Sequence, residues 1–401
     1  MKNYLLGLGL IISLTFFTIS YSYAQVEVAA DQLSEILKYT KGKRVGITLN
    51  HTSVLSDSLQ THLLDHLMAH KVDVRKLYTP EHGLRGTSDA GKSIASGRDQ
   101  KSGLPIISLY GNHRKPTARD LSGIDVMLFD LQDVGVRFYT YISTLYYVLE
   151  ACAEEGVPVI VLDRPNPHDT IDGFVLKDKK YRSFVSLLPI PTVHGLTLGE
   201  AAEMINGEGW LARGLKAELT VITVKGWRHG DPYSLVVSPS PNLRSDRAIL
   251  LYPTICYFEA SSWSEGRGTK MPFEQIGYPD KRMGTNRFVP RSQEGATHPK
   301  HKGRACYGPD LNNYDVKLGI NLDIILDAAR VSRKYGVVFI KRSAFFNLLA
   351  GNSDFLSQVN SGMSAEQIRA TWQPGLEEYK KLRRKYLLYP DYREDDVIVS
   401  D

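Results

Sequence analysis

The sequence predicts an α/β fold with a Rossmann-like, mostly parallel sheet flanked by helices and a second, smaller α+β domain. Three observations lead to this prediction. Apolar segments of strand length alternate with amphipathic segments of helical length from residue 44 to about residue 168. The strand-like segments are almost continuously apolar, as expected of parallel strands covered on both faces. Beyond residue 168 the alternation gives way to irregular Pro- and Gly-containing connections, and a helix–strand pattern returns from residue 317.

Five segments of the first half have the composition of buried parallel strands. They are residues 44–49, 72–78, 104–110, 124–129 and 157–162. Helices are predicted between them at 58–70 and 142–155. Each strand ends in a polar loop, and parallel strands of an open sheet present their carboxyl ends to the ligand-binding crevice. We therefore expect the five loops to form the wall of one cleft.

The second half shows fewer regular elements. The expected ones are helices at 197–206 and 320–334, strands at 219–224 and 336–341, and a last helix that ends near residue 386. Ser364 and Gln367 form a capping box at the start of that helix, and Pro374-Gly375 is expected to interrupt it. We assign residues 25–185 to the Rossmann-like domain and residues 186–401 to the smaller domain that closes the cleft.

The N-terminus has the pattern of a signal peptide. Lys2 provides the positive charge, residues 5–19 are apolar, and Ser22-Tyr23-Ala24 is a small-residue cleavage site. The apolar run is too short to favour a membrane span. We therefore expect residues 1–24 to be removed and the protein to be exported, either to the periplasm or out of the cell.

Charge and motif content argue against several classes of protein. The net charge of +5 is spread over interspersed acidic and basic residues, so nucleic-acid binding is not indicated. The histidines and the three cysteines form no metal-binding spacing, and no metal site is predicted. No GxGxxG follows the first strand, so no nucleotide cofactor is expected. Export would permit a disulfide between Cys256 and Cys306, and the sequence does not decide whether it forms.

Glu81 is the strongest catalytic candidate. It follows the second strand and Pro80, and it precedes His82 and Gly83, so the backbone is preset before it and able to turn after it. A carboxyl group that its surroundings keep protonated can donate a proton to a leaving group. The alternative is a structural role, in which Glu81 caps the next segment or pairs with Arg85.

A second group of candidates follows the fourth strand. Asp130 and Asp133 are candidates for the second carboxylate that glycosidases use as a base or nucleophile. Arg137 lies in the same short stretch and, like Arg114 and Arg267, can bind a carboxylate through two N–H groups. The alternative is that one aspartate caps the following helix and that Arg137 is its ion partner.

Eight short motifs along the chain carry a family resemblance. They are residues 49–54 (LNHTSV), 80–86 (PEHGLRG), 114–117 (RKPT), 130–141 (DLQDVGVRFYTY), 162–167 (LDRPNP), 194–200 (HGLTLGE), 240–242 (SPN) and 264–269 (SEGRGT). Each motif alone is weak. Together they span nearly the whole chain after Gly42, and the set resembles the NamZ-type exo-β-N-acetylmuramidases.

The resemblance implies an exo-acting glycosidase that releases N-acetylmuramic acid from the non-reducing end of peptidoglycan fragments. It implies an active cleft between a Rossmann-like domain and a smaller one, and it places the catalytic glutamate on Glu81. The second catalytic group stays open between Asp130 and Asp133. Hydrolysis needs no cofactor, and the expected partner is a peptidoglycan-derived saccharide.

N-acetylmuramic acid has chemical groups that the loops could recognise. Its lactyl carboxylate requires an arginine or lysine, and its acetamido group requires amide or hydroxyl partners. The side chains expected to bind the sugar are those of Asn50, His82, Arg114, Arg137, Tyr139, Asn166, His194, Asn242, Glu265, Arg267 and Thr269. For His194, capping of a turn is an equal alternative.

Two other functions compete with the glycosidase. A periplasmic muropeptide- or sugar-binding protein would have the same two-domain cleft but would bind without turnover. A metal-dependent amidase acting on the stem peptide is a third option, which chelator-insensitive activity would exclude. A serine esterase is disfavoured because no GxSxG motif is present.

Overall fold

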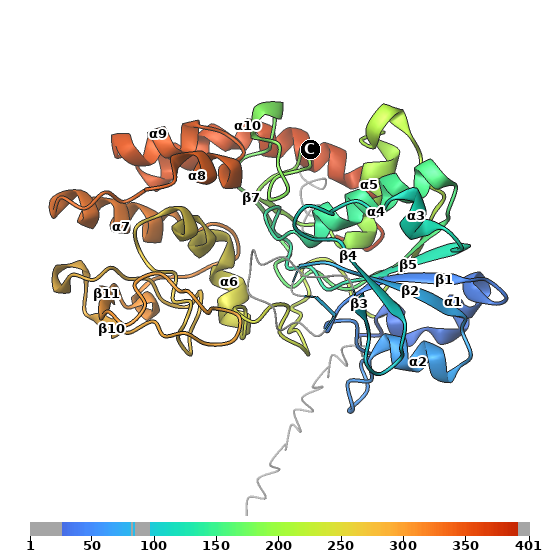
Figure 1. Cartoon of the computed structure of the whole chain (residues 1–401). Helices are drawn as coiled ribbons and strands as arrows, with labels where there is room; N and C mark the ends of the chain where they lie inside the picture. Colours follow the sequence, from blue (N-terminus) through green and yellow to red (C-terminus); the bar gives the residue numbers. More distant parts are fainter. Residues whose placement is uncertain (1–25, 82, 85–96, 392–401) are drawn as a thin grey trace, which may run out of the picture.

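The computed structural model describes residues 26–81, 83–84 and 97–391, which form two parts lying side by side (Figure 1). The part that begins the chain is built around a sheet, and the other part is mainly helical. The expected signal peptide, residues 1–24, lies outside the described residues. Within the described ranges, no helix has both the length and the apolar character needed to cross a membrane.

The main sheet has seven strands in the order β3-β4-β2-β1-β5-β6-β9. The strands are β1 (Val45–Leu49), β2 (Val74–Thr79), β3 (Gly97–Arg98), β4 (Pro105–Ser108), β5 (Val126–Asp130), β6 (Val159–Leu162) and β9 (Leu219–Ile222). Every neighbouring pair is parallel except β3 and β4. Without the short β3, the strand order is that of a Rossmann fold. The predicted fold class is confirmed, and all five predicted strands of the first half are present.

Helices cover both faces of this sheet (Figure 1). They are α1 (Leu33–Thr40) and α2 (Leu63–Ala69) on one face, and α3 (Ala118–Leu121), α4 (Tyr141–Glu155) and α5 (Leu198–Gly207) on the other. Leu128 of β5 belongs to the same apolar cluster as residues of α1 and α2, whereas its neighbours Met127 and Phe129 belong to the cluster that contains α4 and α5. Burial of both faces explains why the strands are continuously apolar.

The second part consists of four helices, a short antiparallel ribbon and long connections. Its elements are α6 (Asp246–Ile255), β10 (Asn286–Phe288), β11 (Cys306–Gly308), α7 (Leu322–Lys334), α8 (Ser343–Ala350) and α9 (Asp354–Ser361). The apolar cluster on the α4 face of the sheet continues into this part through Tyr257, Phe346 and Phe355. The two parts therefore share one core. Cys152, Cys256 and Cys306 are buried free thiols, so no disulfide forms between Cys256 and Cys306.

Three details of the predicted secondary structure are wrong. Residues 336–341 form no strand and make a single bridge from Ile340 to Ser261, because this segment runs beside a loop and not beside a sheet. Helix α10 (Ala365–Arg383) begins at the predicted capping box but continues through Pro374. Trp372 and Leu376 are buried on either side of that proline, and this packing stabilises the helix across it. Helix α2 begins at residue 63 and not at residue 58.

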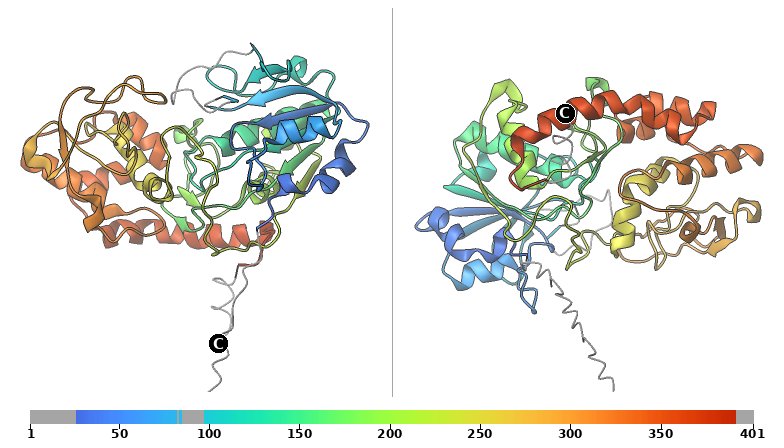
Figure 2. Two further views of the ribbon diagram at one scale, coloured as in Figure 1. Left: turned by 90° about the horizontal axis from the view of Figure 1, so that it is seen from below. Right: turned by 180° about the vertical axis from the view of Figure 1, so that it is seen from behind.

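The end of the chain returns to the sheet. Helix α10 runs along both parts, as the two views of Figure 2 show. Its last turns pack on a small antiparallel pair, β7 (Ile171–Asp172) and β8 (Val193–His194): the Tyr379 hydroxyl donates to the His194 carbonyl at 2.8 Å. Beyond the helix, the Tyr389 hydroxyl donates to Asp163 at 2.6 Å. Strand β9, helix α5 and this terminal segment all follow the boundary expected at residue 186, and all pack on the sheet part.

A buried histidine joins these segments. The ring of His229 lies 3.0 Å from an oxygen of Asp169 and 2.9 Å from an oxygen of Glu200. Burial alone would lower the pKa of His229, but hydrogen bonds to the two carboxylates outweigh burial and raise the pKa to about 9. The Leu388 amide also donates to Glu200, so the charged imidazole lies where the chain end is anchored.

We expect this histidine to make the free energy of unfolding fall at alkaline pH. Because its folded pKa lies above the unfolded value, the stabilisation is complete below about pH 6.5 and is lost as the pH rises through about 9. The loss should be on the order of 3 kcal/mol in the free energy of unfolding, measured by urea denaturation between pH 6.5 and 10. His229→Gln should be less stable at pH 6.5 and should lose less over this range. If the free energy of unfolding fell equally with pH in the wild type and in His229→Gln, the raised pKa would not belong to His229.

Candidate active site

A cavity of about 760 Å³ lies between the two parts and is lined by residues from both. The sheet part contributes Glu81 after β2, Tyr110 after β4 and residues 138–140 before α4. The second part contributes side chains from residues 240–273, 295–300 and 342–349. Three of the five predicted strand-end loops therefore reach one cavity. The loops after β1 and β6 do not line it.

Glu81 is held in this cavity by two hydroxyl donors. The Tyr110 hydroxyl donates to its Oε1 at 2.9 Å, and the Thr140 hydroxyl donates to its Oε2 at 3.0 Å. Burial and the nearby Glu81 raise the pKa of Tyr110, so the phenol keeps its proton and acts as a donor. Both carboxyl oxygens thus have fixed positions. Arg85, the predicted structural partner, lies outside the described residues, as does His82.

The wall formed by the second part carries a chain of charges. Arg267 donates to Glu259 at 2.7 Å and lies 3.4 Å from Glu265, and Lys300 lies 2.8 Å from the other oxygen of Glu265. Burial alone would raise the pKa of Glu265, but Lys300 and Arg267 outweigh burial and lower it. This wall of the cavity therefore carries an ionised carboxylate, that of Glu265, whereas Glu81 belongs to the facing part.

Four of the predicted site residues line the cavity: Glu81, Tyr139, Glu265 and Arg267. The Tyr139 hydroxyl donates to the Pro239 carbonyl at 2.7 Å, and its ring packs edge-on against Tyr252. Tyr139 thus links the loop before α4 to the connection that enters the second part. Its ring contributes an apolar surface to the site.

Asp130, one of the two candidates for the second carboxylate, lies elsewhere. It is completely buried, and Arg164 binds it through two hydrogen bonds of 2.6 and 2.9 Å. The second nitrogen of Arg164 also donates to the Val54 carbonyl. Asp130 therefore belongs to a structural ion pair that joins the ends of β5 and β6.

Arg137 is also structural. It is completely buried, and its guanidinium donates to the carbonyls of Phe174, Ile190, Leu349 and Ala350. Burial lowers the pKa of Arg137 to about 10, which leaves it charged at neutral pH. The predicted ion pair with an aspartate of the same loop is not formed, because the side chain instead joins the two parts of the protein through their backbones.

A buried polar layer contains three further predicted residues. Asp133 accepts from the Gly135 amide at 2.7 Å, and His194 lies 3.6 Å from it while accepting from the Leu196 amide. Asn166 donates to the Leu196 carbonyl and accepts from the His168 amide. These contacts fix the loops that follow β5, β6 and β8 to one another. His194 thus has the turn-capping role that was left as its alternative.

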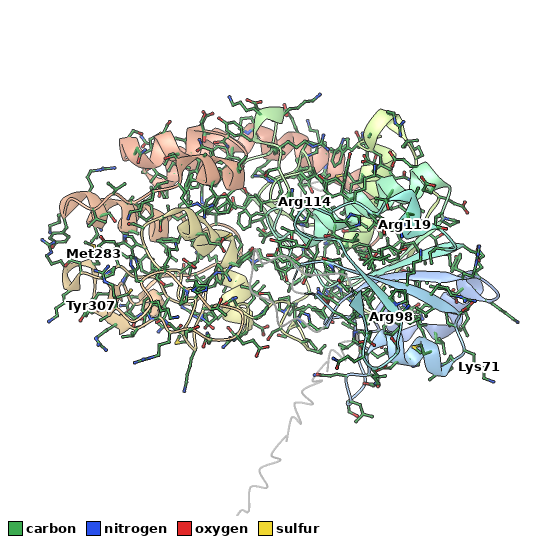
Figure 3. All side chains as sticks on the ribbon, viewed as in Figure 1. Lys71, Arg98, Arg114, Arg119, Met283 and Tyr307 are labelled. Carbon is green, nitrogen blue, oxygen red and sulfur yellow. The ribbon has the colours of Figure 1, made fainter. Side chains whose placement is uncertain are left out.

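The last four predicted residues do not line the cavity. Asn50 donates to the Tyr141 hydroxyl at 2.6 Å, and Asn242 donates to the carbonyl of Gly295, a residue of the lining. Thr269 accepts from Gln275 at 2.8 Å. Arg114 lies 4.5 Å over the Phe184 ring and borders a separate hollow at the surface; Figure 3 labels it near the middle of the molecule.

Sequence reasoning missed several residues of the cavity. They are Tyr110, Thr140, Glu259, Lys300 and Arg342. Tyr110 and Thr140 could have been found from the sequence. Tyr110 is the last residue of the predicted strand 104–110, and Thr140 lies in the motif at 130–141 that follows another predicted strand. The other three lie in segments without regular periodicity, and only the tertiary fold brings them to the site. Among the described residues, no three His, Cys, Asp or Glu side chains are grouped so that they could hold a metal ion.

Comparisons with known proteins agree with this architecture. The chain matches the family models described as exo-beta-N-acetylmuramidase NamZ, N-terminal, over residues 45–247, and NamZ, C-terminal, over residues 250–389. A curated relative, the peptidoglycan beta-N-acetylmuramidase NamZ of Bacillus subtilis, is 36% identical over 382 residues, which cover 89% of each chain.

Two crystal structures of DUF1343 family proteins from Bacteroides fragilis have the same fold. One is 40% identical with a TM-score of 0.82, covering 92% of this chain and all of the other. The second is 29% identical with a TM-score of 0.76, covering 91% of this chain and 99% of the other. Both family models, the long alignment with the curated relative and the shared fold lead to one conclusion: the chain belongs to the NamZ family of exo-β-N-acetylmuramidases.

Proposed function

We propose that this protein is an exo-acting glycoside hydrolase that releases N-acetylmuramic acid from the non-reducing end of peptidoglycan fragments. The observation that carries the proposal is the position of Glu81 in a cavity between the two parts, with both carboxyl oxygens held by hydroxyl donors. Family membership supports the same chemistry. A cavity of about 760 Å³ also has the size of a small-molecule site.

In the proposed reaction, Glu81 in its protonated form donates its proton to the glycosidic oxygen as the bond to the sugar breaks. Positive charge develops on the sugar ring in such reactions. Glu265 is an ionised carboxylate on the facing wall, beside Glu259, and we assign Glu265 the stabilisation of that charge. Water then adds its hydroxyl group to the anomeric carbon, its remaining proton restores the protonated form of Glu81, and the reaction consumes nothing else. Neither Asp130 nor Asp133 takes part, because neither lines the cavity.

We further propose that the protein is exported and meets its substrate in the cell envelope. The charged start, the apolar run and the small residues before residue 25 support export. Peptidoglycan fragments arise in the same compartment. The proposed function and the proposed location are therefore consistent with each other.

The experiment that tests the function measures turnover and not binding alone. We expect the purified protein to convert the disaccharide of N-acetylmuramic acid and N-acetylglucosamine into the two free sugars, detected by mass spectrometry. Activity should persist in the presence of a chelator. A muropeptide-binding protein would instead give saturable heat in calorimetry and an intact disaccharide. That result would reject the hydrolase.

A further inference from the structure

The positive charges of the cavity are almost all used within the protein. Arg267 is paired with Glu259 and Glu265, and Lys300 is paired with Glu265. Lys300 also donates to the backbone carbonyls of Phe258 and Trp263, at 2.5 and 2.7 Å. The protons of this ammonium group therefore already have acceptors, and these two cations have little capacity left for a ligand.

Arg342 is different from the other two cations of the lining. It lines the same cavity and is exposed, and no ion pair with a carboxylate is formed by it among the described residues. Its guanidinium carbon lies 4.4 Å from the centre of the Phe345 ring, another residue of the lining. Stacking on a ring leaves the N–H groups at the edge of the guanidinium available to an acceptor.

The backbone holds Arg342 in place. Its amide donates to the Ala260 carbonyl at 3.0 Å, and its carbonyl accepts from the Phe346 amide at 2.9 Å, where helix α8 begins. Phe346 is completely buried. The backbone of Arg342 is thus fixed on both sides before a ligand arrives, which lowers the entropic cost of binding one.

A stacked guanidinium with available donors suits a planar, negatively charged group such as a carboxylate. N-acetylmuramic acid differs from N-acetylglucosamine by one such group, its lactyl carboxylate. We propose that Arg342 binds the lactyl carboxylate of the terminal sugar and so selects N-acetylmuramic acid over N-acetylglucosamine. The proposal rests on the proposed function and adds a specificity-determining residue to it. It replaces Arg137, which is buried, and Arg114, which borders another hollow.

The test compares two substrates that differ in one group: the disaccharide with its lactyl carboxylate, and the same disaccharide with an uncharged lactyl carboxamide of nearly the same shape. In the wild-type protein, amidation should lower kcat/KM by about 10- to 100-fold, because a hydrogen-bonded charge pair is lost. Arg342→Met should lose a similar factor on the carboxylate substrate. The variant should hydrolyse the carboxamide about as well as the wild type does, which also shows that it is folded.

Lys341→Met is the matched control, because it removes the same charge from the neighbouring exposed residue, which does not line the cavity. It should discriminate between the two substrates as the wild type does. If Arg342→Met discriminates as strongly as the wild type, or if the wild type does not discriminate, the role of Arg342 is rejected while the hydrolase stands. If the wild-type protein hydrolyses neither substrate, the proposed function itself fails.

Discussion

Replacement of Glu81 by glutamine should reduce kcat for the disaccharide by about 10²- to 10⁴-fold, the range that general acid catalysis supplies. Glutamine has nearly the same shape and can still bind Tyr110 and Thr140, which hold the carboxyl group in place. Its amide N–H groups are too weakly acidic to protonate the glycosidic oxygen. The variant should therefore bind substrate normally and fail in the chemical step, so that kcat falls and KM changes little.

The leaving group provides the control for this prediction. The nitrophenolate released from a nitrophenyl glycoside is a stable anion and needs less protonation than the alkoxide of a sugar leaving group does. Glu81→Gln should therefore lose much less activity on nitrophenyl N-acetylmuramide than on the disaccharide. Equal losses on the two substrates would show that Glu81 does not act as the acid. Activity of the variant close to that of the wild type on both would remove Glu81 from the mechanism.

The second large effect is expected on stability and not on catalysis. Asp130→Asn should lower the free energy of unfolding by about 3–5 kcal/mol, since it leaves Arg164 buried without its counter-charge. Both members of the pair are buried, and the pair joins the loops after β5 and β6. Urea denaturation monitored by circular dichroism measures the loss. The folded fraction of the variant should keep a kcat close to that of the wild type.

A double variant separates the two possible roles of Asp130. Asp130→Leu combined with Arg164→Met removes both charges, and such replacements often recover the stability that a single change loses. We expect the double variant to be more stable than Asp130→Asn. If Asp130 were instead the second catalytic carboxylate, kcat would fall in every variant that lacks it. That outcome would also contradict the assignment of Glu265 to the site.

The sequence predicted the sheet well because burial on both faces leaves a simple pattern. The apolar runs around Ile47 and Leu128 could belong only to covered strands, and the alternating helices then fixed a parallel sheet. Glu81 was predicted for a related reason, since its place after a strand and between Pro80 and Gly83 is a local signal. Such features depend on neighbours in the chain and are visible without the fold.

The remaining site residues depend on distant partners. Asp130 and Arg137 have the composition of an active-site loop, but their roles are decided by Arg164 and by carbonyls more than 200 residues away. Polar residues at strand ends can either bind a substrate or hydrogen-bond to the backbone, and the sequence does not distinguish these two roles. Arg342 follows an irregular segment whose packing against residue 260 has no periodic signature.

The return of the C-terminal segment to the sheet has a consequence for how the chain acquires its structure. The residues that hold Asp163, Glu200 and His194 in place include Tyr389, Leu388 and Tyr379, which lie in helix α10 or after it. Residues 26–247 alone lack these partners, so the Rossmann-like half cannot complete its polar interior before residues 379–389 have been added to the chain. Final closure of the sheet part must therefore wait for synthesis of the segment that follows helix α10.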